Sequence, residues 1–330
     1  MAICARRLIR SAVAPALVAG AFAVLVHAQV PAKPYSPPWT PDGHPDFTGF
    51  WNDGTATPFE RDSALGAKEF YTDQEFADLA ARVKRGELRR AGNGAQEAVY
   101  DRTVYGYDAS NDPLVSTRRT SLVIGPDGRI PQMLPDAAKR NAARAAALKG
   151  HEFDSYESFS LEVRCILSGL ETIPMIPAQD INVNFQILQG QGSVVIYQEI
   201  SHDVRVIPTD GRPHISPAIR QLQGDSVGRW EGDTLIVDTT NFTDRTAFRG
   251  SSENLHLVER LTRTGPGTIL YRFTVEDPAT WATPWTAEIV WNKTDKGIYE
   301  YACQEGNNAI FLALGGARAQ EKEAAQKNAK

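Results

Sequence analysis

The sequence predicts an all-β protein, built as one antiparallel, barrel-like domain with helical decoration near its N-terminus. The first observation is a series of short apolar segments after Ser155, with turn residues between them. The second is that apolar and polar residues alternate within these segments, which is the period of a strand. The third is that no helical pattern alternates with them, so βαβ units and a doubly wound nucleotide-binding fold are not expected.

The β-rich part begins near Asn184. Within it, Ile269, Tyr271, Phe273 and Val275 share one strand face. An antiparallel barrel and a sandwich both fit such a series of strands. The expected strands are Phe185–Leu188, Val194–Glu199, Asp203–Ile207, Gly228–Glu231, Thr234–Thr239, Leu257–Arg263, Ile269–Glu276, Ala287–Trp291 and Ile298–Ala302.

An earlier strand is expected around Phe47 to Trp51, where Phe47, Gly49 and Trp51 alternate with Thr48 and Phe50. A Gly-x-Trp sequence on a first strand is compatible with a barrel whose lower end is closed by the tryptophan. Together with the later strands, it favours a calycin- or lipocalin-like barrel.

Helices are expected before the β-rich part. Thr72 followed by Glu75 forms a capping box ahead of apolar residues at helical spacing. Gly125-Pro-Asp-Gly128 predicts a turn. The expected elements are a helix within Glu60–Arg90, a hairpin formed by Thr120–Ile124 and the chain returning at Ile130, a helix over Asp136–Gly150, and a charged helical tail over Ala317–Lys330.

The N-terminus has the pattern of a secretory signal. Three arginines precede a small, apolar run, and Val26-His27-Ala28 fits a cleavage site. A membrane anchor is the alternative, but the run is short and Pro-rich polar sequence follows it. We therefore expect a signal peptide over 1–28, a Pro-rich leader over 29–45, one β-rich domain over 46–316 with helical insertions at about 60–150, and a tail over 317–330. The mature protein would be periplasmic or secreted, without stable membrane insertion.

Two cysteines, Cys165 and Cys303, remain after Cys4 leaves with the signal. In an oxidising compartment an even pair is most simply a disulfide. A buried pair of thiols, and a nucleophile or metal ligand, are the alternatives.

Several classes of function are disfavoured by the sequence. The formal net charge of -5 argues against nucleic acid and anionic membranes as partners. The chain has no P-loop, no G-x-G-x-x-G and no G-x-S-x-G elbow, so ATP, NAD and a serine nucleophile are not expected. His202, His214 and His256 lack the close spacing of a zinc site. We expect neither a metal nor a cofactor, and the sequence leaves the oligomeric state open.

Long motifs carry a resemblance to a known group of proteins. They are His202-Asp-x-Arg-x-Ile-Pro-x-x-Gly-Arg-Pro-His214 and Gly224-Asp-Ser-x-Gly-Arg-Trp-Glu-Gly-Asp-Thr-Leu235, and they continue through Tyr299-Glu-Tyr-x-Cys303. Over about 154–321 the chain resembles a widespread family of exported bacterial proteins without an established general function. One departure is Gln304, where the resemblance implies a histidine. The resemblance supports the expected fold and implies no catalytic residues.

The highest density of ionisable groups lies between Glu199 and Phe242. On a strand, the neighbours His202 and Asp203 would point to opposite faces, whereas Asp203 and Arg205 would share one. The following loop is stiffened by prolines and carries Asp210, Arg212 and His214. A histidine held beside carboxylates and guanidinium groups suits acid–base chemistry. We therefore expect His202, Asp203, Arg205, Asp210, Arg212 and His214 to be catalytic; structural ion pairs and an exposed loop histidine are the alternatives.

The next segment predicts a hairpin. Glu231-Gly232-Asp233-Thr234 fits a two-residue type II′ loop. That register puts Trp230 on the core face, and Arg229 diagonal to Asp238 on the other. Because an aromatic ligand is suited to aromatic walls, the expected substrate-binding residues are Arg229, Glu231, Trp230, Trp285 and Tyr301.

Two hypotheses about function follow. The first is a cofactor-independent lyase, isomerase or hydrolase that acts on a small, aromatic or terpenoid-like molecule by acid–base catalysis. The histidines would transfer the proton, and Arg205, Arg212 and Arg229 would stabilise an oxyanion. The alternative is a barrel that binds a small ligand without chemistry. A third reading is a structural protein whose charged stretch is a salt-bridged surface.

Overall fold

The computed structural model describes residues 35–85, 115–167, 183–246 and 248–329. The expected signal peptide and the start of the leader lie outside these residues, as does the end of the helix expected over Glu60–Arg90. No helix among the described residues has the length and apolar character needed to cross a bilayer.

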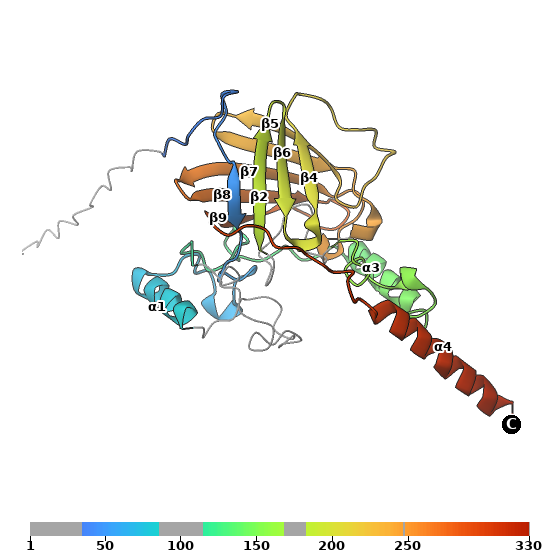
Figure 1. The fold of residues 1–330 in the computed structure, drawn as a ribbon. Coiled ribbons are helices and arrows are strands. Elements are labelled where there is room, and N and C mark those ends of the chain that lie inside the picture. Colours follow the sequence, from blue (N-terminus) through green and yellow to red (C-terminus); the bar gives the residue numbers. More distant parts are fainter. Residues whose placement is uncertain (1–34, 86–114, 168–182, 247, 330) are drawn as a thin grey trace, which may run out of the picture. The chain divides into compact units, whose positions relative to one another are not determined.

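The described chain forms an all-β, nearly closed antiparallel barrel with few helices, as the sequence predicts (Figure 1). The strand order is β4-β3-β2-β1-β9-β8-β7-β6-β5. The strands are β1 Gly49–Asn52, β2 Asn184–Gly190, β3 Ser193–Gln198, β4 Val204–Pro208, β5 Asp225–Glu231, β6 Thr234–Thr240, β7 His256–Gly265, β8 Thr268–Glu276 and β9 Trp285–Lys293.

The barrel is not closed by a main-chain ladder. All eight neighbouring pairs in the sheet order are antiparallel, so strand directions alternate along it. With an odd number of strands, β4 and β5 at the two ends must run in the same direction. We call the contact between them the seam. Side chains bridge it, because Arg205 Nε of β4 donates to Ser226 Oγ of β5 at 3.1 Å.

Close packing also joins the two strands of the seam. A Cβ atom added to Gly228 of β5 would lie 2.9 Å from side-chain carbons of Ile207 and Thr209. Glycine at this position therefore allows β5 to approach β4 more closely than a larger residue would.

The core lies inside the barrel and is rich in aromatic side chains. Trp51, Tyr271 and Trp291 are fully buried, and the rings of Tyr271 and Trp291 stack with centroids 4.3 Å apart. The Trp51 indole donates to the Phe47 carbonyl at 2.8 Å. Buried rings that contact one another contribute more than their apolar area alone. The tryptophan of the Gly-x-Trp segment is thus part of the packed core.

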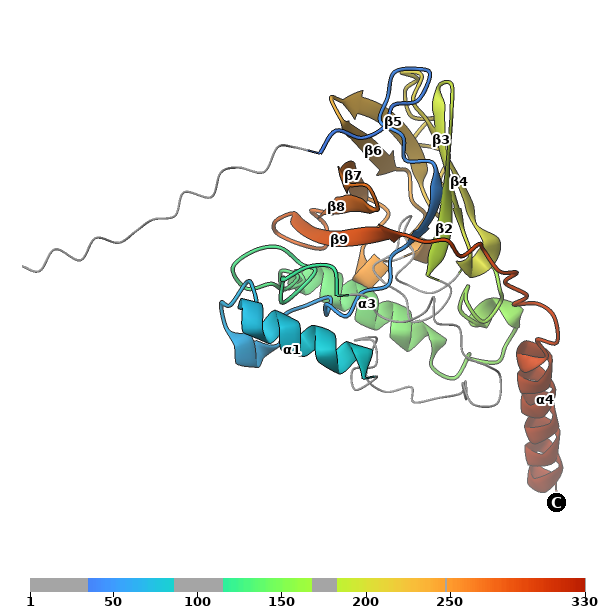
Figure 2. The ribbon, with the colours of Figure 1, turned by 60° about the vertical axis from the view of Figure 1, so that its left-hand side comes forward.

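Helices cluster at one end of the barrel. The helices α1 (Asp73–Lys84) and α3 (Pro135–Leu148) both lie beyond the same strand ends (Figures 1 and 2). The predicted capping box of Thr72 and Glu75 is present. The helix α4 (Ala309–Asn328) starts eight residues before the expected tail. The start of the segment expected to be helical over Glu60–Arg90 has only the 3₁₀ turn η1 (Ser63–Leu65), which ends at Gly66 with a positive φ, and α1 begins after the Thr72 cap.

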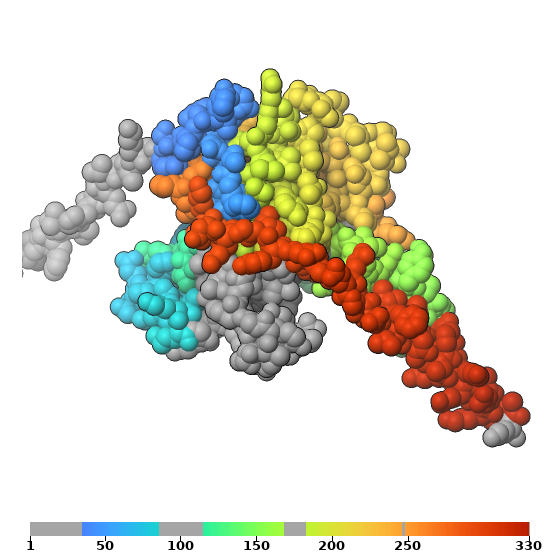
Figure 3. Space-filling model, viewed as in Figure 1, coloured from blue at the N-terminus to red at the C-terminus, as the bar shows by residue number. Residues whose placement is uncertain are grey.

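Two expected β-elements are wrong. Ile298–Ala302 is not a strand; it belongs to a segment that crosses the ends of β2, β3 and β4 before α4 (Figures 1 and 3). Side chains of the β3–β4 corner bind its backbone in place of a neighbouring strand. The hairpin at Thr120–Ile130 is also absent: the Gly125–Gly128 turn forms, but Val123 makes only an isolated bridge to Ala287.

The predicted disulfide between Cys165 and Cys303 is present and links residues 138 positions apart. It holds the segment after β9 to the turn that contains Cys165. A long loop closed in this way raises the free energy of the unfolded chain.

The packing across the seam gives a testable expectation. Gly228→Ala should lower the free energy of unfolding by about 1–3 kcal/mol, because the added methyl would collide with β4. The measurement is urea unfolding of the two proteins.

The matched control is Gly190→Ala in β2, where the added Cβ would have only Ser193 Oγ near it, at 4.0 Å. That change should alter stability by less than about 1 kcal/mol. Equal losses for the two variants would contradict a tightly packed seam.

Candidate functional site

The corner between β3 and β4 has a strained backbone. In the 3₁₀ segment η4 (Ile200–His202), Ser201 has φ 59° and His202 has φ 51°, although neither is glycine. A left-handed conformation costs about 1–3 kcal/mol at such residues and persists only where the surroundings hold it. Two such residues in succession mark this corner as a candidate site.

Asp203 follows the strained residues directly and is partly buried. Burial raises the pKa of its carboxyl to about 6, whereas a hydrogen bond from Gln223 lowers that pKa. Gln223 Nε2 donates to Oδ2 at 3.0 Å. Among the described residues, Oδ1 accepts no hydrogen bond. The result is a carboxyl that changes charge close to neutral pH.

His202 and Glu199 bind the segment that follows β9. Nε2 of His202 lies 3.1 Å from the Tyr299 carbonyl and 3.0 Å from the Tyr301 amide nitrogen, and the tautomer decides which it pairs with. Glu199 is buried and accepts from the Tyr299 amide at 3.2 Å. Both side chains therefore hold residues 299–301 against the corner.

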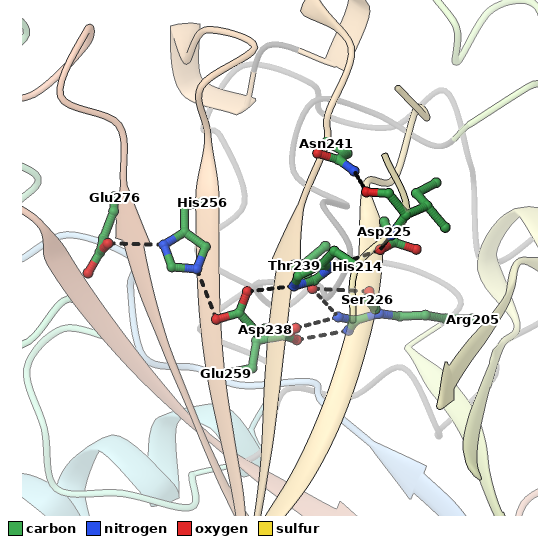
Figure 4. Close-up of polar contacts among 11 residues, drawn as sticks. Arg205, His214, Asp225, Ser226, Asp238, Thr239, Asn241, His256, Glu259 and Glu276 are labelled. Carbon is green, nitrogen blue, oxygen red and sulfur yellow. Dashed lines mark hydrogen bonds and ion pairs between the residues drawn. The ribbon is translucent and has the colours of Figure 1, made fainter. Parts of the chain in front are cut away.

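Arg205 lies inside the barrel, in the cluster shown in Figure 4. Its guanidinium forms a bidentate ion pair with Glu259 of β7 and donates to Thr239 of β6 at 2.9 Å. Tyr271 donates its hydroxyl to Glu259 at 2.9 Å. Arg205 is 6% exposed and Glu259 is 0% exposed, so the pair is desolvated. Burial, followed by the charge of Glu259, raises the pKa of Tyr271 well above its usual value.

His214 lies outside the barrel, in a row of alternating carboxylates and imidazoles (Figure 4). Asp225 and Asp238 are diagonal neighbours on the outer face of β5 and β6, and His214 from the β4–β5 loop lies between them at 2.8 and 3.0 Å. His256 follows, 3.0 Å from Asp238 and 3.0 Å from Glu276. We call these five residues the carboxylate–imidazole array.

The array favours the protonated form of His256. Each imidazole contacts a carboxylate through both ring nitrogens, and ionised carboxylates accept hydrogen bonds only. The hydrogen bond that His256 donates to Asp238 is the main cause that raises the pKa of His256 to about 9. The hydrogen bond from His256 is the main contact that lowers the pKa of Asp238, and His214 lowers it further. Because Asp225 and Asp238 bind both ring nitrogens of His214, the array acts as a charged clasp that holds the β4–β5 loop against β5 and β6.

The remaining predicted charged residues form surface pairs. Asp210 and Arg212 bind each other, with Arg212 Nη2 2.6 Å from Asp210 Oδ2, and the hydrogen bond lowers the pKa of Asp210 to about 2. Arg229 pairs with Glu231, which also binds Arg260. Arg229 and Asp238 occupy the expected diagonal positions, but they do not pair with each other, because Asp238 binds the two histidines. Arg205, Arg212 and Arg229 therefore each bind a different carboxylate and do not form one anion site.

The aromatic residues expected to bind substrate have separate positions. Trp230 stacks on His44 with ring centroids 4.6 Å apart. Trp285 is a core residue and makes an edge contact with Trp281 at 5.7 Å. Tyr301 contributes its backbone amide to His202. The structure does not gather these residues around one ligand.

Sequence reasoning missed Glu259, Gln223 and Glu276 as partners. Glu259 occupies an inward position between Leu257 and Leu261, and a charged residue in an apolar alternation indicates a buried partner. Arg205 gives the same signal, because it shares a face with the buried Ile207. Gln223 carries no such signal, because it lies in a loop.

No protein-family model matches the chain, and the comparison with curated proteins also finds no match. The resemblance to exported bacterial proteins therefore stays a prediction. Within residues 35–85, 115–167, 183–246 and 248–329, no group of three or more His, Cys, Asp or Glu side chains is arranged to hold a metal ion.

The array should make stability depend on pH. The folded pKa of His256 lies above its ordinary value, so its stabilisation is complete below about pH 6.5 and is lost as pH rises through 9. Asp238→Asn should cost about 1–2 kcal/mol at pH 6, discounted for partial exposure, and much less at pH 10.

The measurement is denaturant unfolding at both pH values, with Asp233→Asn in the exposed hairpin turn as control. A loss for Asp238→Asn that is the same at pH 6 and pH 10 would rule out a charged clasp.

Proposed function

We propose that the protein is a cofactor-independent acid–base enzyme, a lyase, isomerase or hydrolase, that acts on a small organic molecule at the β3–β4 corner. Asp203 is the group that takes or gives the proton. The observation that carries the proposal is a partly buried carboxyl with a pKa near 6 and one oxygen not engaged by the described residues. Catalytic acids and bases are most effective when their pKa lies near the working pH.

The strained backbone supports the same position. Consecutive left-handed residues immediately before Asp203 have a conformational cost, and such cost is concentrated at functional sites. His202 lies beside the carboxyl in sequence, and the second oxygen of Asp203 is left for a reactant or a water molecule. At pH 7 a group with a pKa near 6 is mostly ionised, so Asp203 is suited to act first as a base.

Of the two histidines predicted to transfer the proton, His202 and His214, His214 is poorly suited to this role. Both of its ring nitrogens already contact carboxylates, and a base needs a free lone pair directed at the substrate. The packed aromatic core likewise favours a site at the corner over one within the barrel.

We also propose that the protein acts outside the cytoplasm and belongs with the exported proteins that its motifs resemble. The disulfide supports this, because such bonds persist in oxidising compartments. The signal-like N-terminal pattern is consistent with it.

The test is turnover of a panel of small aromatic and terpenoid esters, lactones and alcohols, followed by mass spectrometry. Asp203→Asn should lower turnover of any substrate found by about 100-fold or more, because loss of a general acid or base has this effect. The wild-type rate should change with an apparent pKa near 6.

Asp127→Asn is the control, since it changes an exposed turn carboxyl in the same way. Full turnover by folded Asp203→Asn would refute the assignment. Stoichiometric binding of a panel compound without conversion would favour a ligand-binding protein.

A further inference from the structure

Asp203 and Gln223 face each other across the seam. Asp203 lies two residues before Arg205 on the β4 side, and Gln223 lies three residues before Ser226 on the β5 side. The Gln223–Asp203 hydrogen bond is therefore the next side-chain link along the seam after that of Arg205 with Ser226. Asp203, the proposed proton-transfer group, is thus bound by Gln223 from the loop that leads into β5.

We infer that Gln223 is a positioning residue for the proposed site, which holds the Asp203 carboxyl by Oδ2 and leaves Oδ1 for the reactant. This inference rests on the proposed function of Asp203. An amide donor suits the task because it has no charge of its own and binds the ionised carboxyl more strongly than the neutral one. No charged side chain among the described residues contacts this carboxyl.

The backbone around Gln223 is fixed on both sides. The amide of Gln221 donates to the Asn241 carbonyl at 2.9 Å, and its carbonyl accepts from the Thr243 amide at 3.0 Å. Gly224 has φ +70°, and a Cβ there would lie 2.6 Å from the Thr240 carbonyl oxygen. A larger residue would push the loop away from β6. Gln221 and Gly224 therefore anchor the backbone on either side of Gln223, so the Gln223 side chain extends to Asp203 from a fixed position.

The anchors are themselves part of the fold. Asn241 adopts φ 60°, and its side chain donates to the Ile215 carbonyl at 3.1 Å. Arg220 donates to the carbonyl groups of Phe242, at 3.0 Å, and Glu253. The loop is thus held to the end of β6 along several residues, which orients the amide before a substrate binds.

The experiment is a carbon-13 NMR titration of aspartate carboxyl groups in the full-length protein, with Asp203→Asn used to assign the Asp203 signal. Gln223→Leu removes the donor and should raise the pKa of Asp203 by about one unit. Gln223→Glu keeps the shape but adds a like charge, and should raise it further.

Gln221→Leu is the matched control, because Gln221 has an exposed side chain and uses its backbone as the anchor. It should leave the pKa of Asp203 unchanged. An unchanged pKa in both Gln223 variants would overturn the positioning role. Because the titration needs no substrate, this result is separate from the turnover test of Asp203→Asn, which decides the proposed function.

Discussion

The ion pair between Arg205 and Glu259 is the interaction on which the barrel depends most. The nine strands form eight antiparallel ladders, and a ninth of the same kind cannot close the barrel, because the two end strands run in the same direction. Arg205 reaches from β4 past Ser226 and Thr239 to a carboxylate on β7. Each charge is satisfied by the other, and separating them would leave a desolvated charge unpaired. Side chains therefore join the two end strands, β4 and β5, which no main-chain ladder joins.

The seam also explains where the candidate site lies. Strands joined by main-chain ladders have their polar backbone groups occupied, whereas the seam is bridged by side chains that differ from position to position. Toward the helical end, the bridge is Asp203 with Gln223, beside the strained corner and the segment that follows β9. Outside the seam strands, the carboxylate–imidazole array fixes the loop that joins them. One region thus combines closure, strain and a carboxyl that titrates near neutral pH.

The strands could be predicted because alternation is a local property of the sequence. The expected hairpin at Glu231–Thr234 has the predicted register. The segment Ile298–Ala302 has the same local pattern, but Glu199 and His202 take its backbone groups, and these lie about a hundred residues away. The pairing of His214 with Asp225 and Asp238 could not be predicted, because it depends on the path of the β4–β5 loop. A charged residue at an inward position, such as Glu259, indicates a buried partner, but the sequence does not identify that partner.

The most direct test of the closure is the free energy of unfolding of Arg205→Met, alone and combined with Glu259→Gln. If the buried pair closes the barrel, the single change should cost about 3–5 kcal/mol, because Glu259 keeps a buried charge without a partner. Adding Glu259→Gln removes that charge, retains an acceptor for Tyr271 and should recover about half of the loss or more. A cost of less than about 1 kcal/mol for Arg205→Met would show that the barrel does not depend on this ion pair.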